Sequence, residues 1–194
     1  MAIMIDKKPE YKGEGKVWEC FANNLPSEAV VYNQREVKGR EFDFCILMKN
    51  VGLIIVEVKG WTADSIFDVA GVDEIIVSGY TKPEKSPKKQ ARAYRFGLLN
   101  LVNERFNVSP LIFDLVCYPF ITKSQYYEKR LDIASEEVLT IFSEDLTDSS
   151  RLGTKLLNAF NQCKAIPHAE MDDVLMVNIR QYFEPHFEVK KPPE

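Results

Sequence analysis

Two acidic residues and one lysine stand where a soluble protein normally has apolar side chains. Asp43 lies within the apolar segment 41–49, and Glu57 and Lys59 lie within a second apolar segment, 53–59. An uncompensated charge in an apolar interior is costly, so buried charges are normally paired or bind a metal. This spacing indicates a site at which two carboxylates and one ammonium group meet.

Such a group of side chains could bind a divalent cation. Two carboxylates about 4 Å apart repel by on the order of 4 kcal/mol at an effective dielectric constant near 20, and a proton or a cation removes that repulsion. Oxygen ligands favour Mg²⁺ or Mn²⁺. In the alternative interpretation, Asp43 starts a strand near water, Glu57 and Lys59 pair with exposed neighbours, and no metal binds. Spacing alone leaves both interpretations open.

A helix is expected to bring a third acid to this site. Residues 12–25 carry apolar side chains at helical spacing, and Pro26 ends the pattern. At 100° per residue Glu14 falls on the apolar side of this helix, whereas Glu19 falls on the opposite side. Glu14 is therefore expected to point toward the core and Glu19 toward water.

Three strands are expected to hold the charged residues. Strand patterns cover residues 29–36, 41–49 and 53–59. The period of two places Asp43 on one face of its strand and Phe42, with Phe44, Ile46 and Met48, on the other. Residues 53–59 are almost continuously apolar, which indicates a central strand covered on both faces, with Glu57 and Lys59 on the same face.

A positively charged segment follows at residues 82–95, where six basic side chains accompany one acid, Glu84. Ser86 and Pro87 predict the start of a helix over residues 88–105. A solvated loop and helix start is the simpler explanation of this composition, and binding to phosphate groups is the alternative. Both explanations stay open at this point.

The remaining elements define the fold class. Apolar runs within 65–80 predict a hairpin that extends the sheet. Further strands are expected at 111–121 and 138–142, and further helices at 150–163 and 171–183. This order predicts an α/β fold with a mixed β-sheet flanked by helices. We expect one domain over residues 1–185 and a tail or linker at 186–194.

Composition excludes several classes of protein. The chain has 194 residues, of which 45% are hydrophobic and 28% charged, as in soluble globular proteins. No segment approaches the roughly 18 apolar residues of a membrane-spanning helix. The four cysteines are scattered without a CxxC pair, which predicts reduced thiols rather than a zinc site. A cytoplasmic protein without membrane contact is expected, and its oligomeric state stays open.

Four short elements follow one another in a characteristic order. They are Gly13-Glu14 at a helix start, Glu41-Phe42-Asp43-Phe44, Ile55-Val56-Glu57-Val58-Lys59-Gly60, and Gln90-x-x-x-Tyr94. Together they resemble the nuclease-related domain, NERD, of the PD-(D/E)xK nuclease superfamily, with Phe42 in the place of the proline. The last element resembles the QxxxY element of RecB-like nucleases. The resemblance covers roughly residues 10–185 and implies a restriction-endonuclease-like core.

The resemblance implies a metal site in this core. Asp43 and Glu57 would ligate Mg²⁺ or Mn²⁺, and the backbone carbonyl of Val58 would add a further ligand. Glu14 would hold a second metal or a water molecule of the first. Lys59 would interact with the attacking water.

The resemblance also implies contacts with DNA. Gln90 would contact the scissile region as part of the catalytic set. The predicted DNA-contacting residues share the basic helix, and they are Lys88, Lys89, Gln90, Arg92, Tyr94 and Arg95. The segment as a whole would bind phosphates without reading base sequence.

The function implied is hydrolysis of DNA phosphodiester bonds, in repair or in defence against foreign DNA. A helicase domain, in the same or another chain, is an expected partner. The alternative is a catalytically weak nucleic-acid-binding or docking module attached to a helicase. A third interpretation is that the fold acts on RNA or on a small phosphoester. Single- and double-stranded substrates, and endo- and exonuclease action, all stay open.

Overall fold

The computed structural model describes residues 1–80 and 82–184, so the predicted tail at 186–194 lies outside the described residues. The helices agree with the predicted ones to within a few residues and add a short one, α3. Their bounds are α1 Lys12–Asn24, α2 Pro87–Phe106, α3 Lys123–Glu128, α4 Ser149–Cys163 and α5 Asp173–Phe183. Short 3₁₀ turns lie at Ala63–Ser65, Leu131–Ile133, Glu137–Leu139 and Ser143–Leu146.

A six-stranded mixed sheet forms the centre of the molecule, in the order β1-β2-β3-β4-β8-β9. Its strands are β1 Ile3–Met4, β2 Val30–Val37, β3 Arg40–Met48, β4 Gly52–Val58, β8 Ile112–Cys117 and β9 Thr140–Ile141. The pairs β2–β3 and β3–β4 are antiparallel, whereas β1–β2, β4–β8 and β8–β9 are parallel. The predicted α/β class with a mixed sheet flanked by helices is confirmed.

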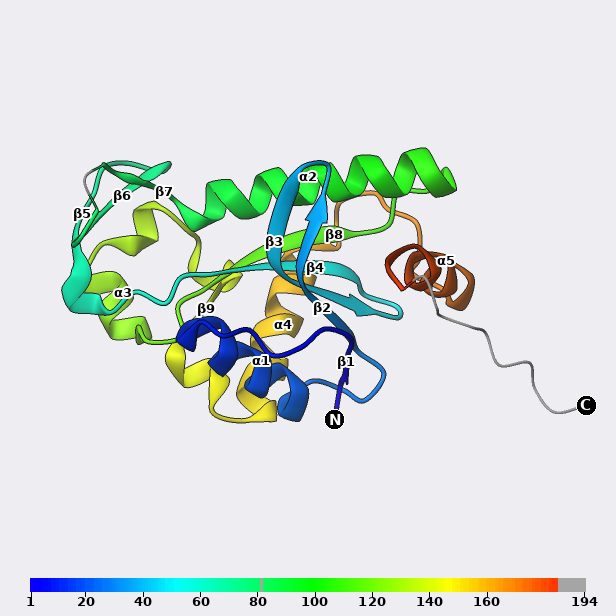
Figure 1. Ribbon diagram of the computed structural model, residues 1–194, viewed down its shortest axis with the longest axis horizontal. Coiled ribbons are helices and arrows are strands. Elements are labelled where there is room, and N and C mark those ends of the chain that lie inside the picture. Colours follow the sequence, from blue (N-terminus) through cyan, green and yellow to red (C-terminus); the bar gives the residue numbers. More distant parts are fainter. Residues whose placement is uncertain (81, 185–194) are drawn as a thin grey trace, which may run out of the picture.

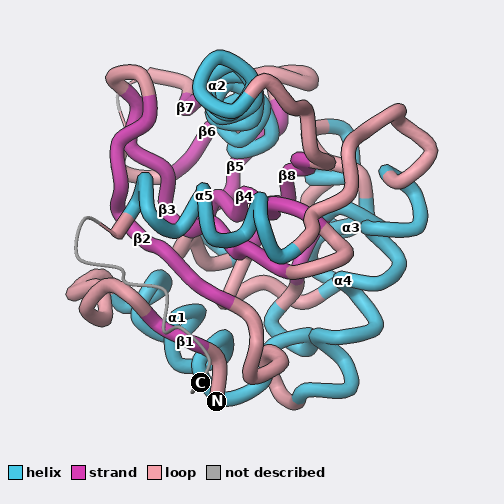
Figure 2. The backbone as a smooth tube through the Cα atoms, turned by 90° about the vertical axis from the view of Figure 1, so that its right-hand side faces the viewer, coloured by secondary structure: helices cyan, strands magenta, loops and turns pink. Residues whose placement is uncertain are grey.

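Helices cover both faces of this sheet (Figures 1 and 2). On one face α1 and α4 pack against the strands through Val17, Phe21, Leu152 and Leu156. On the other face α2 and α5 pack through Ala91, Leu98, Leu175 and Ile179. The sheet is thus the middle layer of three, and its strand ends are the places where polar side chains can meet.

The central strand β4 behaves as predicted. All of its residues are buried, and they alternate between the two faces. Leu53 and Ile55 pack under α2, whereas Ile54 and Val56 pack over α1 and α4. The same alternation places Glu57 on the α2 side, at the end of the strand.

The face predicted for Phe42 is wrong. Phe44 and Ile46 lie on the α1 side, but Phe42 packs on the α2 side with Tyr32. The paired strand β2 contains Gln34 with φ of +51°, a left-handed conformation that interrupts the period of two. The side chains of both strands therefore change faces at this point, which is also the level of Asp43.

The predicted hairpin at 65–80 exists but does not extend the main sheet. Strands β5 Ile66–Val69 and β6 Glu74–Val77 join β7 Glu84–Lys85 in a separate three-stranded sheet. The position beside β4 is taken by β8, which α2 brings back parallel to it. The small sheet instead packs its apolar side chains on Tyr118 and Ile121, at one end of the molecule (Figure 1).

Two further sequence-based expectations concern α2 and membranes. Ser86 caps α2 by accepting a hydrogen bond from the Lys89 N–H, and Pro87 is the first helical residue, as predicted. Within residues 1–80 and 82–184 no helix combines the length and apolar character needed to cross a bilayer.

A glycine at the start of β4 is expected to be irreplaceable. Gly52 has φ of +133°, and a Cβ there would lie 2.1 Å from the carbonyl oxygen of Leu111. We expect Gly52→Ala to lower the free energy of unfolding by about 1–3 kcal/mol, through backbone strain and this collision. Urea unfolding measures it. Gly71→Ala is the matched control, because Gly71 has φ of +124° with open space around it; equal losses would contradict the collision.

Candidate active site

The structure brings Asp43 and Glu57 together where β3 and β4 separate. The last paired residues of this antiparallel ladder are Phe44 and Val56. Beyond them the Val58 N–H of β4 bonds to a side chain of β3 and not to its backbone. The Oδ2 atom of Asp43 accepts this 2.7 Å hydrogen bond. The divergence of the two strands therefore fixes the Asp43 carboxylate beside the end of β4.

The two carboxyl groups form a buried pair. Burial raises the pKa of Asp43, against the hydrogen bond from Val58. Burial, followed by the nearby charge of Asp43, raises the pKa of Glu57 to about 8. The Glu57 side chain is only 4% exposed, and its Oε2 atom has no hydrogen-bond partner. Positive charge therefore compensates this pair of carboxyl groups only in part.

Lys59 supplies part of that charge. Its Nζ atom lies 3.3 Å from Oε1 of Glu57, and its side chain is 23% exposed. The same Nζ atom lies 5.9 Å from the centre of the Trp61 ring. Lys59 therefore connects the buried pair to the surface, as its position two residues after Glu57 on one face predicted.

Glu14 arrives from the start of α1, and its partner was not foreseen. Gln34 donates a 3.1 Å hydrogen bond from Nε2 to Oε2 of Glu14. Burial, followed by the charge of Asp43, raises the pKa of Glu14, so Glu14 lies close enough to the acidic pair to be affected by its charge. The glutamine comes from the point in β2 where the strand pattern breaks, and no sequence signal singled it out.

A cleft of about 580 Å³ opens beside these residues. Glu14, Val58 and Lys59 line it, whereas the buried Glu57 and the partly exposed Asp43 do not. The remaining lining residues come from the start of α1 and from the loops after β4, β6 and β8; they include Tyr11, Trp61, Tyr80 and Phe120. Lys59 is therefore the charged group that a molecule in the cleft would meet above the buried pair.

A second hollow, of about 450 Å³, lies on the α2 side and is basic. Arg40, Lys85 and Lys89 line it together with Gln90 and Tyr94. The Oε1 atom of Gln90 is buried without a partner. Burial, followed by the charges of Glu57 and Asp43, raises the pKa of Tyr94 to about 12. Tyr94 thus lies near the acidic pair, and the predicted Gln90 lines the same hollow. The sequence did not indicate Arg40.

Two residues predicted to contact DNA turn inward instead. The Nζ atom of Lys88 lies 2.9 Å from Asp114 and the Nε atom of Arg95 lies 3.4 Å from it. Asp114 is 2% exposed and Lys88 only 13%. Lys88 and Arg95 occur at the same helical spacing as the buried Ala91, so they face the sheet. They therefore leave the predicted DNA-contacting set, whereas Lys89 and Arg92 stay exposed.

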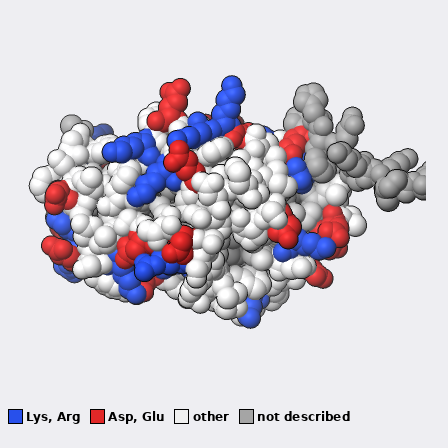
Figure 3. Space-filling view, turned by 90° about the horizontal axis from the view of Figure 1, so that it is seen from below, with Lys and Arg blue, Asp and Glu red and all other residues white. Residues whose placement is uncertain are grey.

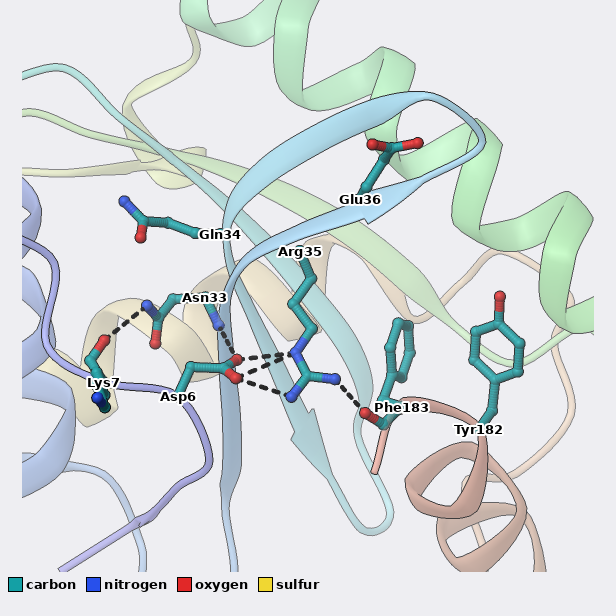
Figure 4. A pocket seen from close by; sticks show the side chains of 8 residues that line it. All are labelled: Asp6, Lys7, Asn33, Gln34, Arg35, Glu36, Tyr182 and Phe183. Carbon is teal, nitrogen blue, oxygen red and sulfur yellow. Dashed lines mark hydrogen bonds and ion pairs between the residues drawn. The ribbon is translucent and has the colours of Figure 1, made fainter. Parts of the chain in front are cut away.

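A further hollow, of about 670 Å³, lies elsewhere and has a structural role (Figure 4). Arg35 donates two hydrogen bonds to Asp6, at 2.8 and 2.9 Å, and a third to the carbonyl of Phe183. These contacts join the N-terminal segment to the end of α5. Asp6 and Arg35, the central charged groups of this hollow, are therefore paired with each other.

Glu57 is expected to make the stability of the protein fall as pH rises. Its pKa is higher in the folded chain, so its stabilisation is complete below the ordinary value of 4.5 and is lost as pH approaches about 8. In the presence of a chelator, the free energy of unfolding of Glu57→Gln, relative to that of the wild type, should rise by on the order of 2 kcal/mol between pH 5 and pH 8. Chemical unfolding at both values measures this gain. The exposed Glu28→Gln is the control, and a gain equal to the control's would contradict the raised pKa.

The described residues contain no group of three or more His, Cys, Asp or Glu side chains arranged to hold a metal ion. Asp43 and Glu57 are thus the close pair of acids at the site, and Glu14 accepts a hydrogen bond from Gln34. A metal here would draw on two carboxylates and on backbone or water oxygens.

Comparison with known proteins agrees with this geometry. The chain matches the family model NERD, described as nuclease-related domain, over residues 9–119 of 194. The match runs from just before α1 to just after β8, so it contains Glu14, the acidic pair and α2, whereas α4 and α5 lie beyond it. No curated protein and no solved structure matches the chain. The chain therefore belongs to the NERD family of nuclease-related domains.

Proposed function

We propose that this chain is a metal-dependent nuclease domain that hydrolyses DNA phosphodiester bonds. The observation that carries the proposal is the close pair of Asp43 and Glu57, short of positive charge, beside the partly exposed Lys59 that lines a cleft. Each oxygen of the structural acid Asp114 lies near a cation, whereas Glu57 has Lys59 at its Oε1 atom only, and its Oε2 atom has no hydrogen-bond partner. Perturbed carboxyl pKa values at a cleft are typical of functional sites.

The residues present fit Mg²⁺ or Mn²⁺. Mg²⁺ in proteins usually takes one or two carboxylates and keeps several waters, and this matches a single close pair of acids. Asp43 and Glu57 would hold the cation, and the carbonyl of Val58 is the nearest backbone candidate. Once bound, the cation would supply Lewis-acid polarisation of the phosphate and a more acidic water.

The side chains around the pair have separate roles in this proposal. Lys59 donates a hydrogen bond to a phosphate oxygen and stabilises the negative charge that develops there. Glu14, whose pKa is raised, accepts a proton or orients a water molecule at the cleft wall. Gln90, whose buried Oε1 atom has no partner, positions the scissile strand from the α2 side.

In this proposal the DNA backbone binds along the basic hollow on the α2 side. Arg40, Lys85 and Lys89 provide cations there, and Arg92 lies exposed one turn further along. The face seen in Figure 3, formed by α1 and α4, carries basic and acidic groups side by side in small mixed clusters. Positive charge is thus concentrated near the site in a chain of net charge −4.

A cleavage assay tests the proposal. Single-stranded and double-stranded DNA are incubated with the purified chain and Mg²⁺, Mn²⁺ or chelator. Cleavage that requires a metal supports the nuclease. The absence of cleavage of either substrate with either metal, at concentrations where DNA is bound, would overturn it and favour a binding module.

Salt dependence tests the basic hollow. Replacing both Lys85 and Lys89 with alanine should reduce the slope of log affinity against log salt by roughly 0.7–0.9 per lost phosphate contact. Fluorescence anisotropy with labelled DNA measures the slope. The control is Lys49→Ala with Lys164→Ala, since Lys49 also forms an exposed ion pair but lies away from the site. Equal slopes in both double variants would remove the hollow from the interface.

A binding or docking module attached to a helicase is the second candidate. The observation that favours it is the depth of Glu57, whose side chain is 4% exposed and leaves little carboxylate surface for a cation. A helicase domain that supplies unwound DNA would be the partner, in repair or defence.

The free thiols of all four cysteines fit a reducing cytoplasm.

A further inference from the structure

The cleft above the acidic pair is unusually aromatic. Tyr11, Trp61, Tyr80 and Phe120 line it, in addition to the proposed active-site residues. Tyr11 is 72% exposed although it is a large side chain, and as the residue before α1 it makes no side-chain cap. The volume of the cleft, about 580 Å³, lies within the range of roughly 300–1,000 Å³ that small-molecule sites occupy.

Basic side chains accompany these rings. The Nζ atoms of Lys16 and Lys12 lie 5.1 and 5.6 Å from the centre of the Phe120 ring. The centre of the Trp61 ring lies 5.9 Å from the Nζ atom of Lys59 and 6.4 Å from the centre of the Tyr118 ring. Planar apolar rings with adjacent cations suit a ligand that alternates planar bases with phosphates. The acids in the cleft are Glu84 and the proposed active-site Glu14.

The two walls of the cleft are held in a fixed relation. Tyr11 precedes α1, and Trp61 follows β4. Between them the backbones of Gly13 and Gly60 pack so closely that a Cβ on Gly13 would lie 3.0 Å from the Cα atom of Gly60. The aromatic rings therefore belong to a preformed surface that is continuous with Lys59.

We infer that this cleft stacks the unpaired bases of single-stranded DNA next to the phosphate to be cleaved. The inference rests on the proposed nuclease function and adds its substrate class. In a duplex both faces of each base are covered by neighbouring pairs, so only an unpaired base can place a face on Tyr11 or Trp61. The basic hollow binds the backbone on the other side of β7, where Glu84 lines the cleft and Lys85 the hollow.

Binding to DNA with and without bases tests the inference. A single-stranded oligonucleotide and an abasic strand of equal length carry the same phosphates but differ in their bases. In chelator, where no cleavage occurs, the natural strand should bind on the order of tenfold more tightly than the abasic strand. Equal affinities, or tighter binding of a blunt duplex than of the single strand at equal salt, would overturn the inference.

Substitutions locate the effect. Tyr11→Ala should weaken binding of the natural strand by roughly fivefold, which is within the tenfold contribution of the bases, and leave the abasic strand unchanged. Trp61→Ala is the second variant and should act in the same direction. Phe67→Ala is the matched control, because Phe67 is 73% exposed but lies on β5 outside the cleft. An equal change in Phe67→Ala, or none in Tyr11→Ala, would contradict a base-stacking cleft.

The binding assay is independent of catalysis. If the chain shows no metal-dependent cleavage but still prefers the natural strand through Tyr11, the proposed nuclease function fails while the base-binding cleft stands. If the chain cleaves DNA but binds natural and abasic strands equally, the nuclease stands and the cleft inference fails. The two proposals can therefore be separated with one preparation of protein.

Discussion

Replacing Lys59 with alanine is expected to lower the rate of DNA cleavage by roughly 10²–10³-fold. Lys59 is the cation closest to the buried pair, 3.3 Å from Glu57, and it reaches the cleft. Its loss removes a preorganised positive charge from the place where negative charge develops on phosphate. It also removes a group that holds down the pKa of Glu57, so more Glu57 will be protonated at neutral pH.

Single-turnover cleavage with Mg²⁺ and DNA binding in chelator measure the two sides of this prediction. Cleavage should fall while affinity for single-stranded DNA changes by less than about threefold, because one surface charge contributes little to binding. Lys164→Ala on the distant end of α4 is the matched control. Cleavage by Lys59→Ala at close to the wild-type rate would show that this lysine has no part in the reaction.

Asp43→Asn should impair cleavage in the same assay for a different reason. The amide retains the size of the carboxyl group and an oxygen that can accept the hydrogen bond from the Val58 N–H. It removes the negative charge that the proposed cation needs. A folded Asp43→Asn variant with wild-type activity would exclude Asp43 from the metal site.

Replacing Asp114 with alanine is expected to cause the largest loss of stability. Asp114 is 2% exposed in the middle of β8 and accepts both Lys88 and Arg95 from α2. Removing one partner of a buried ion pair leaves an uncompensated charge, which typically costs about 3–5 kcal/mol. The two remaining cations would also repel each other. Urea unfolding at neutral pH measures the loss.

An exposed ion pair on the same helix provides the control. Asp73 lies 3.6 Å from Lys89, and both side chains are more than half exposed, so Asp73→Ala should cost at most about 1 kcal/mol. If Asp114→Ala costs no more than this control, Asp114 has no role in docking α2. A confirmed loss would mean that Asp114 also positions Gln90 and Tyr94, which lie between Lys88 and Arg95 on the docked helix.

The sequence by itself determined the elements and much of the site. Apolar spacing predicted α1, α2 and the central strand, and Ser86 with Pro87 marked the start of α2. These features depend on local rules, namely helix periodicity, strand alternation and capping, which act over a few residues. An acid inside an apolar strand is equally local, and this signal drew attention to Asp43 and Glu57.

The same signal did not separate function from structure. Asp114 also stands in an apolar strand, 111–121, and was passed over. Each oxygen of Asp114 lies within 3.4 Å of a cation from α2, whereas Glu57 has a cation at its Oε1 atom only. Whether a buried acid is satisfied depends on side chains far away in the sequence, so only the tertiary structure could distinguish a structural acid from the proposed metal ligands.

Long-range packing decided the rest. It turned Lys88 and Arg95 inward, left Lys89 outside, and brought Gln34 to Glu14 from a strand whose alternation is broken. It also gathered aromatic side chains from four separate segments into one cleft beside Lys59. Long and planar side chains take their direction from whichever partner the folded chain brings near. The sequence thus determined which residues could do chemistry, and the tertiary structure decided which of them face the substrate.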